Sequence, residues 1–266
     1  MPFSIDILKL VVATAIVLLL AIIAERVSPR TAGIISGYPA GIAINLFFFG
    51  LEIGPAFAAE SALYTSAGLV ATQACVYFYY LASRWAGERA LIVPSFAAIA
   101  GYLLVILMLK QFSIGSTEAI LVPVLSIFIY VRLFRTIPNV IIAQRIALTW
   151  RVLLLRAAVA AALVLIVTGA AHYVGPAYAG LFAAFPTTLF PLMVIVHATY
   201  GSGAVHTIIK NFPLGLGSLI IYSISVFFTY SSQGIILGTL TSFVAATLYL
   251  AGYVLCVGWL RRSRGN

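Results

Sequence analysis

Long apolar runs, separated by short polar segments, follow one another along almost the whole chain of 266 residues. An α-helix needs roughly 20 predominantly apolar residues to cross the hydrocarbon core of a membrane, and each run is about that long. The pattern therefore predicts an all-α integral membrane protein without a separate soluble domain. The nine predicted spans lie at about 5–25, 31–51, 60–83, 91–110, 116–135, 152–172, 177–198, 205–230 and 233–259.

The composition of the chain agrees with a membrane protein. It is 63% hydrophobic and 8% charged, with a mean hydropathy of +1.14, whereas about 25% of the residues of a soluble domain are charged. The first run has Asp6 before Lys9 and no clear small-x-small cleavage site, so we expect a retained helix rather than a signal peptide. Cys75 and Cys256 both fall inside predicted spans, which favours buried thiols over a disulfide.

The formal net charge of +9 is distributed unevenly about the nine predicted spans. One side of the membrane would carry only Lys9 and Lys110. By the positive-inside rule, the other side is the cytoplasm, with the C-terminus inside and the N-terminus outside a prokaryotic-type inner membrane. Topology and attraction to anionic lipid explain the charge, so no nucleic acid is expected as a partner. The cytoplasmic basic residues are Arg26, Arg30, Arg84, Arg89, Arg132, Arg135, Arg145, Arg151, Arg156, Lys210, Arg261, Arg262 and Arg264.

A spaced pattern of Val, Pro, Ala and Gly occurs twice, once in each half of the chain, at a constant offset of 147 residues. The copies are Val27, Pro29, Ala32, Gly33, Pro39 and Gly54, and then Val174, Pro176, Ala179, Gly180, Pro186 and Gly201. Because an odd number of predicted spans separates the copies, the second would be upside down relative to the first, as in many secondary transporters. The sequence therefore predicts a 4+1+4 inverted repeat, with repeats at 1–112 and 149–266 and a connecting helix and cytoplasmic linker at 113–148.

The segment Tyr178–Ile209 resembles the GlpM-type small inner-membrane proteins, which are single units of about four predicted helices. The residues that carry the match are Ala179, Gly180, Leu181, Phe185, Pro186 and Thr187. The first half keeps only Ala32, Gly33 and Pro39, with Tyr38 in the aromatic place and Ala40 in the threonine place. The resemblance implies two fused units that do what one unit would do as an antiparallel pair. It also implies a link to alginate-type exopolysaccharide production, and it names no catalytic residue.

Glycine and proline interrupt the second and the seventh predicted span at matching places. Gly33, Gly37 and Gly41 lie four residues apart on one helix face, and their equivalents are Gly180, Ala184 and Thr188. A matched pair of interrupted spans is the best sequence pointer to a transporter's substrate site, although simple kinking and close packing would use the same residues. The predicted substrate-binding residues are Tyr38, Pro39, Gly41, Asn45, Pro186, Thr187 and Thr188.

Four polar residues near or within the spans are candidates for coupling or ion binding. Glu60 and His206 could each carry a proton, since ionisable groups in membranes are usually functional or paired and histidine titrates near neutral pH. Lys210, four residues after His206 and on the same face, could hold an anion. The alternative for Glu60 and Lys210 is an interfacial position. Gln73 needs an internal hydrogen-bond partner, and it either lines a cavity or joins two helices.

The sequence contains no phosphate-binding loop, no metal-spaced cluster and no nucleophile elbow. We therefore predict no enzyme, no cofactor and no metal. The predicted function is secondary transport of a small solute by alternating access, with proton coupling through Glu60 or His206 as a further hypothesis. A channel-like pore and a non-transporting membrane partner in exopolysaccharide production are the alternatives, and a homodimer is left open.

Overall fold

The structure is a computed structural model that describes residues 7, 9–12, 14, 15, 28–140 and 150–264. Those residues form helices joined by short loops, without a strand among them, which confirms the all-α prediction. The helices are α2 (Pro29–Ile35), α3 (Ala40–Glu52), α4 (Pro55–Trp85), α5 (Ile92–Leu109), α6 (Ser116–Phe134), α7 (Trp150–Ala183), α8 (Leu189–Tyr200) and α9 (Ser202–Arg264). The first predicted span and the part of the linker at 141–149 lie largely or wholly outside the described residues.

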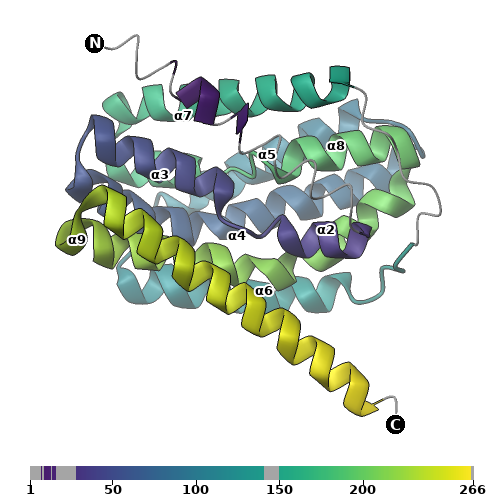
Figure 1. Cartoon of the computed structure of the whole chain (residues 1–266). Coiled ribbons are helices and arrows are strands. Elements are labelled where there is room, and N and C mark those ends of the chain that lie inside the picture. The colour runs from purple at the N-terminus through teal and green to yellow at the C-terminus, as the bar shows by residue number, and fades with distance from the viewer. Residues whose placement is uncertain (1–6, 8, 13, 16–27, 141–149, 265–266) are drawn as a thin grey trace.

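Two of these helices contain one residue with a non-helical backbone. Gly175 (φ 72°, ψ 169°) divides α7, and Gly234 (φ 76°, ψ 176°) divides α9. At Gly234 the chain turns back on itself, so α9 consists of two legs, residues 202–233 and 235–264 (Figure 1). A positive φ combined with an extended ψ would cost a residue with a Cβ about 1–3 kcal/mol, and glycine avoids that cost.

Local sequence signals explain where several helices begin. Pro29 and Pro55 occupy the first turns of α2 and α4, where the missing N–H is not needed and the fixed φ suits a helix. The Ser28 hydroxyl accepts a hydrogen bond from the backbone N–H of Thr31 at 3.3 Å and so caps α2. Pro176 follows the positive-φ Gly175 in the same way, so the last turns of α7 begin as a new helical segment.

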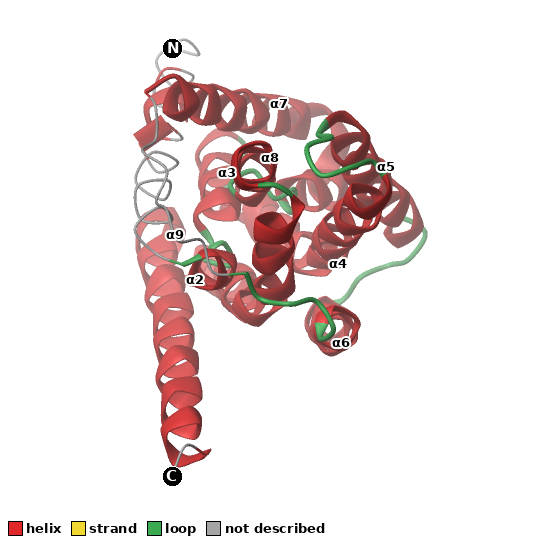
Figure 2. Ribbon diagram, turned by 90° about the vertical axis from the view of Figure 1, so that its right-hand side faces the viewer, coloured by secondary structure: helices red, strands yellow, loops and turns green. Residues whose placement is uncertain are grey.

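The long helix α4 lies at the centre of the bundle and packs against α5, α6, α7 and the first leg of α9. Figure 2 looks along several helices, so that α6 and α8 are seen end-on, while the second leg of α9 projects away from the bundle. Small residues such as Ala62, Ala67 and Gly68 fill the buried face of α4, and small residues allow helices to approach closely in membranes. The core therefore depends on close backbone packing.

The outer surface of the bundle is apolar. Large side chains such as Leu104 on α5, Phe128 on α6 and Leu248 on α9 are more than half exposed. Five helical stretches among the described residues are long and apolar enough to cross a membrane: Pro29–Glu52, Ile92–Leu109, Ser116–Phe134, Ala161–Ala183 and Ser202–Cys256. Such a surface on helices of that length indicates a protein that is surrounded by lipid.

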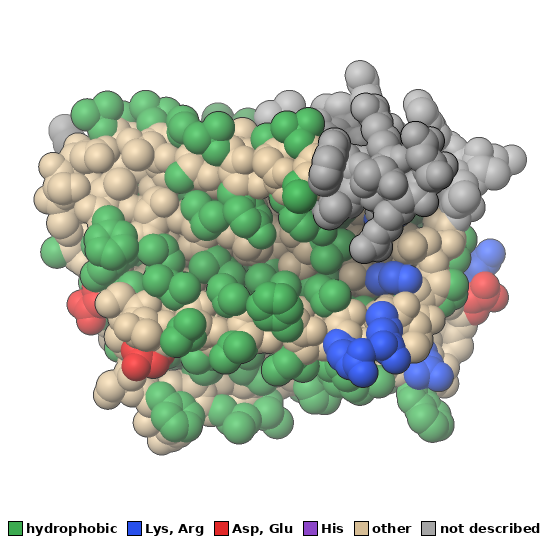
Figure 3. Space-filling model, turned by 90° about the horizontal axis from the view of Figure 1, so that it is seen from below, with side chains coloured by type: hydrophobic (Ala, Val, Ile, Leu, Met, Phe, Trp, Pro, Cys, Tyr) green, Lys and Arg blue, Asp and Glu red, His purple; other side chains and the backbone are tan. Residues whose placement is uncertain are grey.

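Charged side chains separate towards the two ends of the bundle. Figure 3 shows a face with Lys and Arg side chains gathered at one end and a broad apolar stretch beside them. We call this the His206 end; contacts of His206, His197 and Lys210 show that α4, α8 and α6 finish there and that α9 begins there. The opposite end, where α3 finishes and α4 begins, is called the Glu52 end. The apolar stretch between the ends has the character expected of a membrane-spanning surface.

Candidate functional site

The helical backbone is interrupted twice inside the bundle. The first break, residues 36–39, separates α2 from α3, and the second, residues 184–188, separates the end of α7 from α8. Each break contains a proline, Pro39 or Pro186, and proline cannot donate the backbone hydrogen bond that a continuous helix requires. The two breaks occupy nearly equivalent positions under the offset of 147 residues. The Gly- and Pro-interrupted spans of the sequence are thus breaks in the helices themselves.

Both breaks face one small cavity near the middle of α4 and of the first leg of α9. The space open to the centres of water molecules is about 20 Å³, little more than the roughly 10–15 Å³ that one bound water needs. The cavity is therefore nearly closed in this conformation. It is lined by Ser36, Tyr38, Gly41, Ile42, Leu69, Thr72, Ala184, Phe185, Pro186, Thr187, Thr188, Leu189, Phe212 and Leu219.

The structure brings most of the predicted substrate-binding residues together at this cavity. Five of the seven line it, namely Tyr38, Gly41, Pro186, Thr187 and Thr188. The other two are Pro39, which is buried at the first residue before α3, and Asn45. The Asn45 side chain is fully buried, and its Nδ2 lies 3.5 Å from the carbonyl oxygen of Ala183. Asn45 thus connects α3 with the end of α7 behind the cavity.

Carbonyl groups released at the breaks are hydrogen-bonded by hydroxyl groups from the long helices. Thr72 of α4 donates to the carbonyl oxygen of Ala184 at 2.6 Å, and Ser218 of α9 donates to that of Gly37. Gly37 and Ala184 are equivalent under the 147-residue offset. Irregular backbone at membrane depth requires such partners, because leaving a buried polar group without its hydrogen bond costs about 1–3 kcal/mol. The sequence analysis did not identify Thr72 or Ser218 as a candidate. They could have been found because two polar residues occupy near-equivalent positions in the third and eighth predicted spans.

Backbone N–H groups at the other side of each break have no such partner. The N–H groups of Gly41 and Ile42 at the start of α3, and of Thr188 and Leu189 at the start of α8, donate to no described residue. All four residues line the cavity. The Thr187 side chain, only 2% exposed, also makes no hydrogen bond with a described residue. The cavity is consequently rich in unused hydrogen-bond donors.

None of the four predicted coupling residues lines the cavity. Glu60 is exposed near the start of α4, whereas His206 hydrogen-bonds Ser83 near the end of α4, at 2.7 Å. At 1.5 Å per residue, the two ends of this helix segment are about 35 Å apart. Lys210 donates to the carbonyl oxygen of Ile137, and Gln73 donates to the Ser126 hydroxyl of α6. Of the two roles expected for Gln73, the structure therefore shows the joining of two helices.

A second histidine lies at the His206 end. His197 of α8 is buried, with its Nδ1 3.0 Å from the Tyr79 hydroxyl and its Nε2 3.1 Å from the carbonyl oxygen of Glu88. Because a carbonyl only accepts, Nε2 carries the proton, and in the neutral ring Nδ1 then accepts from tyrosine. These contacts fasten the end of α8 to the end of α4 and to the loop that follows it.

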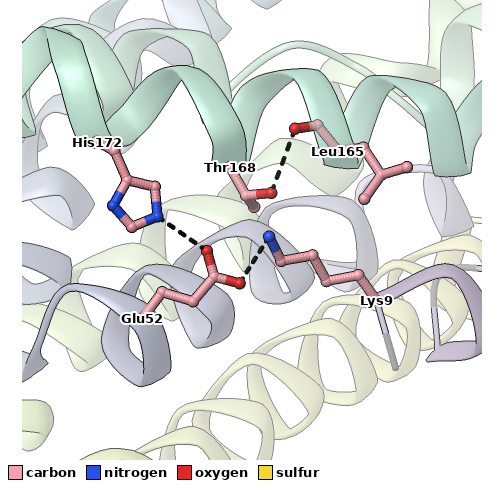
Figure 4. Close-up of polar contacts among 5 residues, drawn as sticks. All are labelled: Lys9, Glu52, Leu165, Thr168 and His172. Carbon is pink, nitrogen blue, oxygen red and sulfur yellow. Dashed lines mark hydrogen bonds and ion pairs between the residues drawn. The ribbon is translucent and has the colours of Figure 1, made fainter. Parts of the chain in front are cut away.

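The Glu52 end carries an ion-paired cluster that sequence reasoning did not predict (Figure 4). The Glu52 carboxylate, at the last residue of α3, lies 2.6 Å from Lys9 Nζ and 3.2 Å from His172 Nε2 of α7. The Lys9 side chain is 4% exposed and that of Glu52 is 10% exposed. Charges at this depth are usually paired. The cluster ties three segments of the chain together at this end.

No family model, curated protein or solved structure matches this chain. The resemblance to GlpM-type proteins accordingly stays a prediction. In the part of the chain that the structure describes, no three His, Cys, Asp or Glu side chains are grouped to hold a metal ion. The site must be interpreted from its own geometry.

Proposed function

We propose that this protein is a secondary transporter that moves a small solute across the membrane by alternating access. The observation that carries the proposal is the meeting of two broken helices at one central cavity. Discontinuous helices with substrate bound at their breaks, near the bilayer midplane, are a recurring construction of secondary transporters. Five predicted substrate-binding residues at the cavity agree with this function.

The proposal includes the nine-span 4+1+4 inverted repeat. Positive-φ glycines support it, since Gly54 matches Gly201 and Gly87 matches Gly234, each at the 147-residue offset. Gly175 is the fifth positive-φ glycine of the described residues, and its equivalent, Ser28, also directly precedes a helix. Turns that require glycine are thus repeated in the two halves. Among the described residues, the helix starts and reversals from Ser28 to Leu109 recur in the same order from Gly175 onward.

Reciprocal packing between the halves gives independent support. A Cβ on Gly33 would clash with the backbone of Ile208, and one on Gly180 would clash with the backbone of Ser61. These two contacts are equivalent under the same offset, because Ser61 corresponds to Ile208. The broken helix of each half therefore packs on the long central helix of the other half. Packing of each half on the other half is what we expect of an inverted repeat around a shared site.

Eight of the proposed spans lie among the described residues: α2 with α3, α4, α5, α6, residues 150–174, residues 176–200, and the two legs of α9. The first span would lie at about 5–25. The arginines at the His206 end favour a cytoplasmic position for that end. The Glu52 end would then face the outside, with the N-terminus outside and the C-terminus in the cytoplasm.

Contacts at both ends suggest how access would alternate. The cluster of Lys9, Glu52 and His172 would close the outer end, and the contacts of His197 and His206 would close the cytoplasmic end. Opening one end while the other stays closed would expose the central cavity to one side at a time. Because the halves are equivalent in backbone, each half can take the role of the other in the opposite state.

The proposal is tested by labelling a cysteine in the cavity from each side of the membrane. Thr188→Cys is introduced into a Cys75→Ala, Cys256→Ala background, and oriented vesicles are treated with a membrane-impermeant thiol reagent. A second variant adds Glu52→Cys and His172→Cys, which a bifunctional thiol reagent joins. We expect the cross-link to stop labelling of position 188 from outside and to increase its rate from the cytoplasmic side.

The reciprocal increase separates a transporter from a channel. In a fixed pore, closing the outer end would leave cytoplasmic access unchanged, and that result would contradict alternating access. Thr199→Cys, on the exposed face of α8 at the His206 end, is the matched control, because its labelling should not respond to the cross-link.

A further inference from the structure

We propose that the solute held in the central cavity is a small monovalent anion; this inference rests on the proposed transport function and specifies its substrate class. Two helices begin at the cavity, α3 with 13 residues and α8 with 12 residues. A helix N-terminus carries the equivalent of roughly +0.5 elementary charge. Two N-termini directed at one space therefore supply about one positive charge.

The hydrogen-bonding groups that face the cavity point to the same ligand. The N–H groups of Gly41, Ile42, Thr188 and Leu189 are unused by described residues. Gly41 corresponds to Thr188 and Ile42 to Leu189 at the 147-residue offset. Both halves therefore leave the same two donors free, as expected if the donors serve a ligand that sits between the halves.

The buried hydroxyl of Thr187 is an independent observation. A buried polar side chain without a partner is unusual, because leaving its hydrogen bond unmade costs about 1–3 kcal/mol. Thr187 is 2% exposed, lines the cavity, and has no hydrogen-bond partner among the described residues. Its oxygen also faces Gly41, where an added Cβ would clash with it. A ligand in the cavity would accept the hydrogen bond that the protein itself leaves unmade.

Two of the carbonyl groups released at the breaks are, in contrast, already used. The carbonyl groups of Gly37 and Ala184 accept from Ser218 and Thr72. The lining also contains no acidic side chain. A cation would thus meet two helix N-termini and no acidic side chain, whereas an anion would meet the positive ends of both helices. The two helix N-termini and the absence of an acidic side chain together favour an anion.

Charge and size restrict the anion further. No Lys, Arg or His side chain lines the cavity, so only the two helix N-termini, with about one positive charge in total, oppose the ligand. A divalent anion would keep an uncompensated charge. The roughly 20 Å³ open to the centres of water molecules leaves room for a single ion somewhat larger than a water molecule. A halide fits this description, and bromide serves as the probe.

Bromide binding is measured on the purified full-length protein in detergent. The unfolding temperature is followed against bromide concentration, with gluconate replacing bromide at constant ionic strength, because a ligand of the native state raises that temperature in a saturable way. Thr187→Val removes one hydrogen bond to a charged group, and we expect bromide affinity to fall by about tenfold or more. Gly41→Ala places a methyl group against the Thr187 hydroxyl, and we expect saturable bromide stabilisation to disappear.

Thr199→Val is the matched control, because its hydroxyl bonds only within α8, to the carbonyl oxygen of Ile195 at 2.7 Å. Its bromide affinity should equal that of the wild type. Unfolding temperatures in gluconate show whether each variant folds. If bromide stabilises the wild type and Thr187→Val equally, or no more than gluconate does, the anion site is overturned.

The anion inference and the transport proposal fail in distinguishable ways. Bromide binding that depends on Thr187, without reciprocal labelling of position 188, would keep the anion site and overturn alternating access. Reciprocal labelling in a protein that gluconate and bromide stabilise equally would keep the transporter and overturn the anion as its substrate class.

Discussion

The two breaks share a backbone design but differ in their side chains. Gly37 in the first break corresponds to Ala184 in the second, and Gly41 at the start of α3 corresponds to Thr188 just before α8. Both breaks keep the same free N–H groups and the same bonded carbonyl. The backbone therefore carries what the two halves have in common, whereas the free hydroxyl of Thr187 belongs to the second half alone. Substitutions at equivalent positions can separate these contributions.

The largest loss of stability is expected from adding a side chain at Gly37, because the first break has less room there than the second break has at the equivalent position. A Cβ on Gly37 would clash with the backbone of Gly215, which cannot rotate away. Gly37→Ala should therefore lower the free energy of unfolding by about 2–3 kcal/mol, the upper part of the range for overpacking. The equivalent position already holds Ala184, whose side chain packs against Gly68. Reversible unfolding in detergent measures the difference.

Gly169→Ala is the matched control for this substitution. An added Cβ at Gly169 meets nothing within 4 Å, so the exchange should change the unfolding free energy by less than about 1 kcal/mol. Equal losses for Gly37→Ala and Gly169→Ala would mean that the close approach at Gly37 does not stabilise the fold.

The next largest loss of stability is expected from replacing the positive-φ glycines Gly54 and Gly201, and it should be the same in both halves. Gly54 (φ 136°, ψ 160°) and Gly201 (φ 80°, ψ −178°) have conformations that cost a residue with a Cβ about 1–3 kcal/mol. Gly54→Ala has open space for its Cβ, and Gly201→Ala meets only the flexible side chain of Glu88 at 3.4 Å. We expect similar losses of unfolding free energy from the two variants. A loss at only one of them would show that the two turns are not equivalent.

The hydroxyl groups of Thr72 and Ser218, which donate to the carbonyl groups released at the breaks, should contribute less to the free energy of unfolding. Thr72→Val and Ser218→Ala each leave one buried carbonyl without its partner, and we expect each to cost about 1 kcal/mol. The losses should add in the double variant, because the two hydroxyls serve separate breaks. Thr65 hydrogen-bonds the carbonyl oxygens of Ser61 and Gly180, so Thr65→Val is a comparable substitution away from the cavity. It should leave bromide affinity unchanged, and a loss of affinity in Thr65→Val would contradict a localised site.

The sequence predicted where the helices lie along the chain better than it predicted which helices pack against each other. Apolar runs gave α4, α5 and α6 within a few residues, and Pro39 and Pro186 marked the breaks, because run length and proline act locally. The partners of Gln73, Thr72 and Ser218 could not be predicted, since they depend on which helices lie side by side. Glu60 shows the same limit: its position near a span end was evident, but its exposure depends on packing.

The smallest effect is expected from removing the charge of Glu52. Glu52 lies at one end of the bundle, where the two halves differ in their side-chain contacts. Glu52 holds Lys9 and His172 together, whereas the equivalent position, Thr199, bonds only within its own helix. Glu52→Gln keeps the shape of the side chain and removes its charge. Because the His172 side chain is 44% exposed, solvent screening limits its pairing with Glu52, which joins α3 to α7 at this end, to about 1 kcal/mol. A change of that size shifts an equilibrium between closed and open conformations by roughly fivefold.

If the cluster closes the outer end, Glu52→Gln should raise the rate at which Thr188→Cys is labelled from outside by about that factor and lower the rate from the cytoplasmic side. Thr199→Val, at the equivalent place in the other half, should change neither rate. Unchanged outside labelling in Glu52→Gln would mean that the ion pairs stabilise the fold without controlling access. The two halves would then differ at their ends for reasons of stability alone, and the control of access would lie in the backbone that they share.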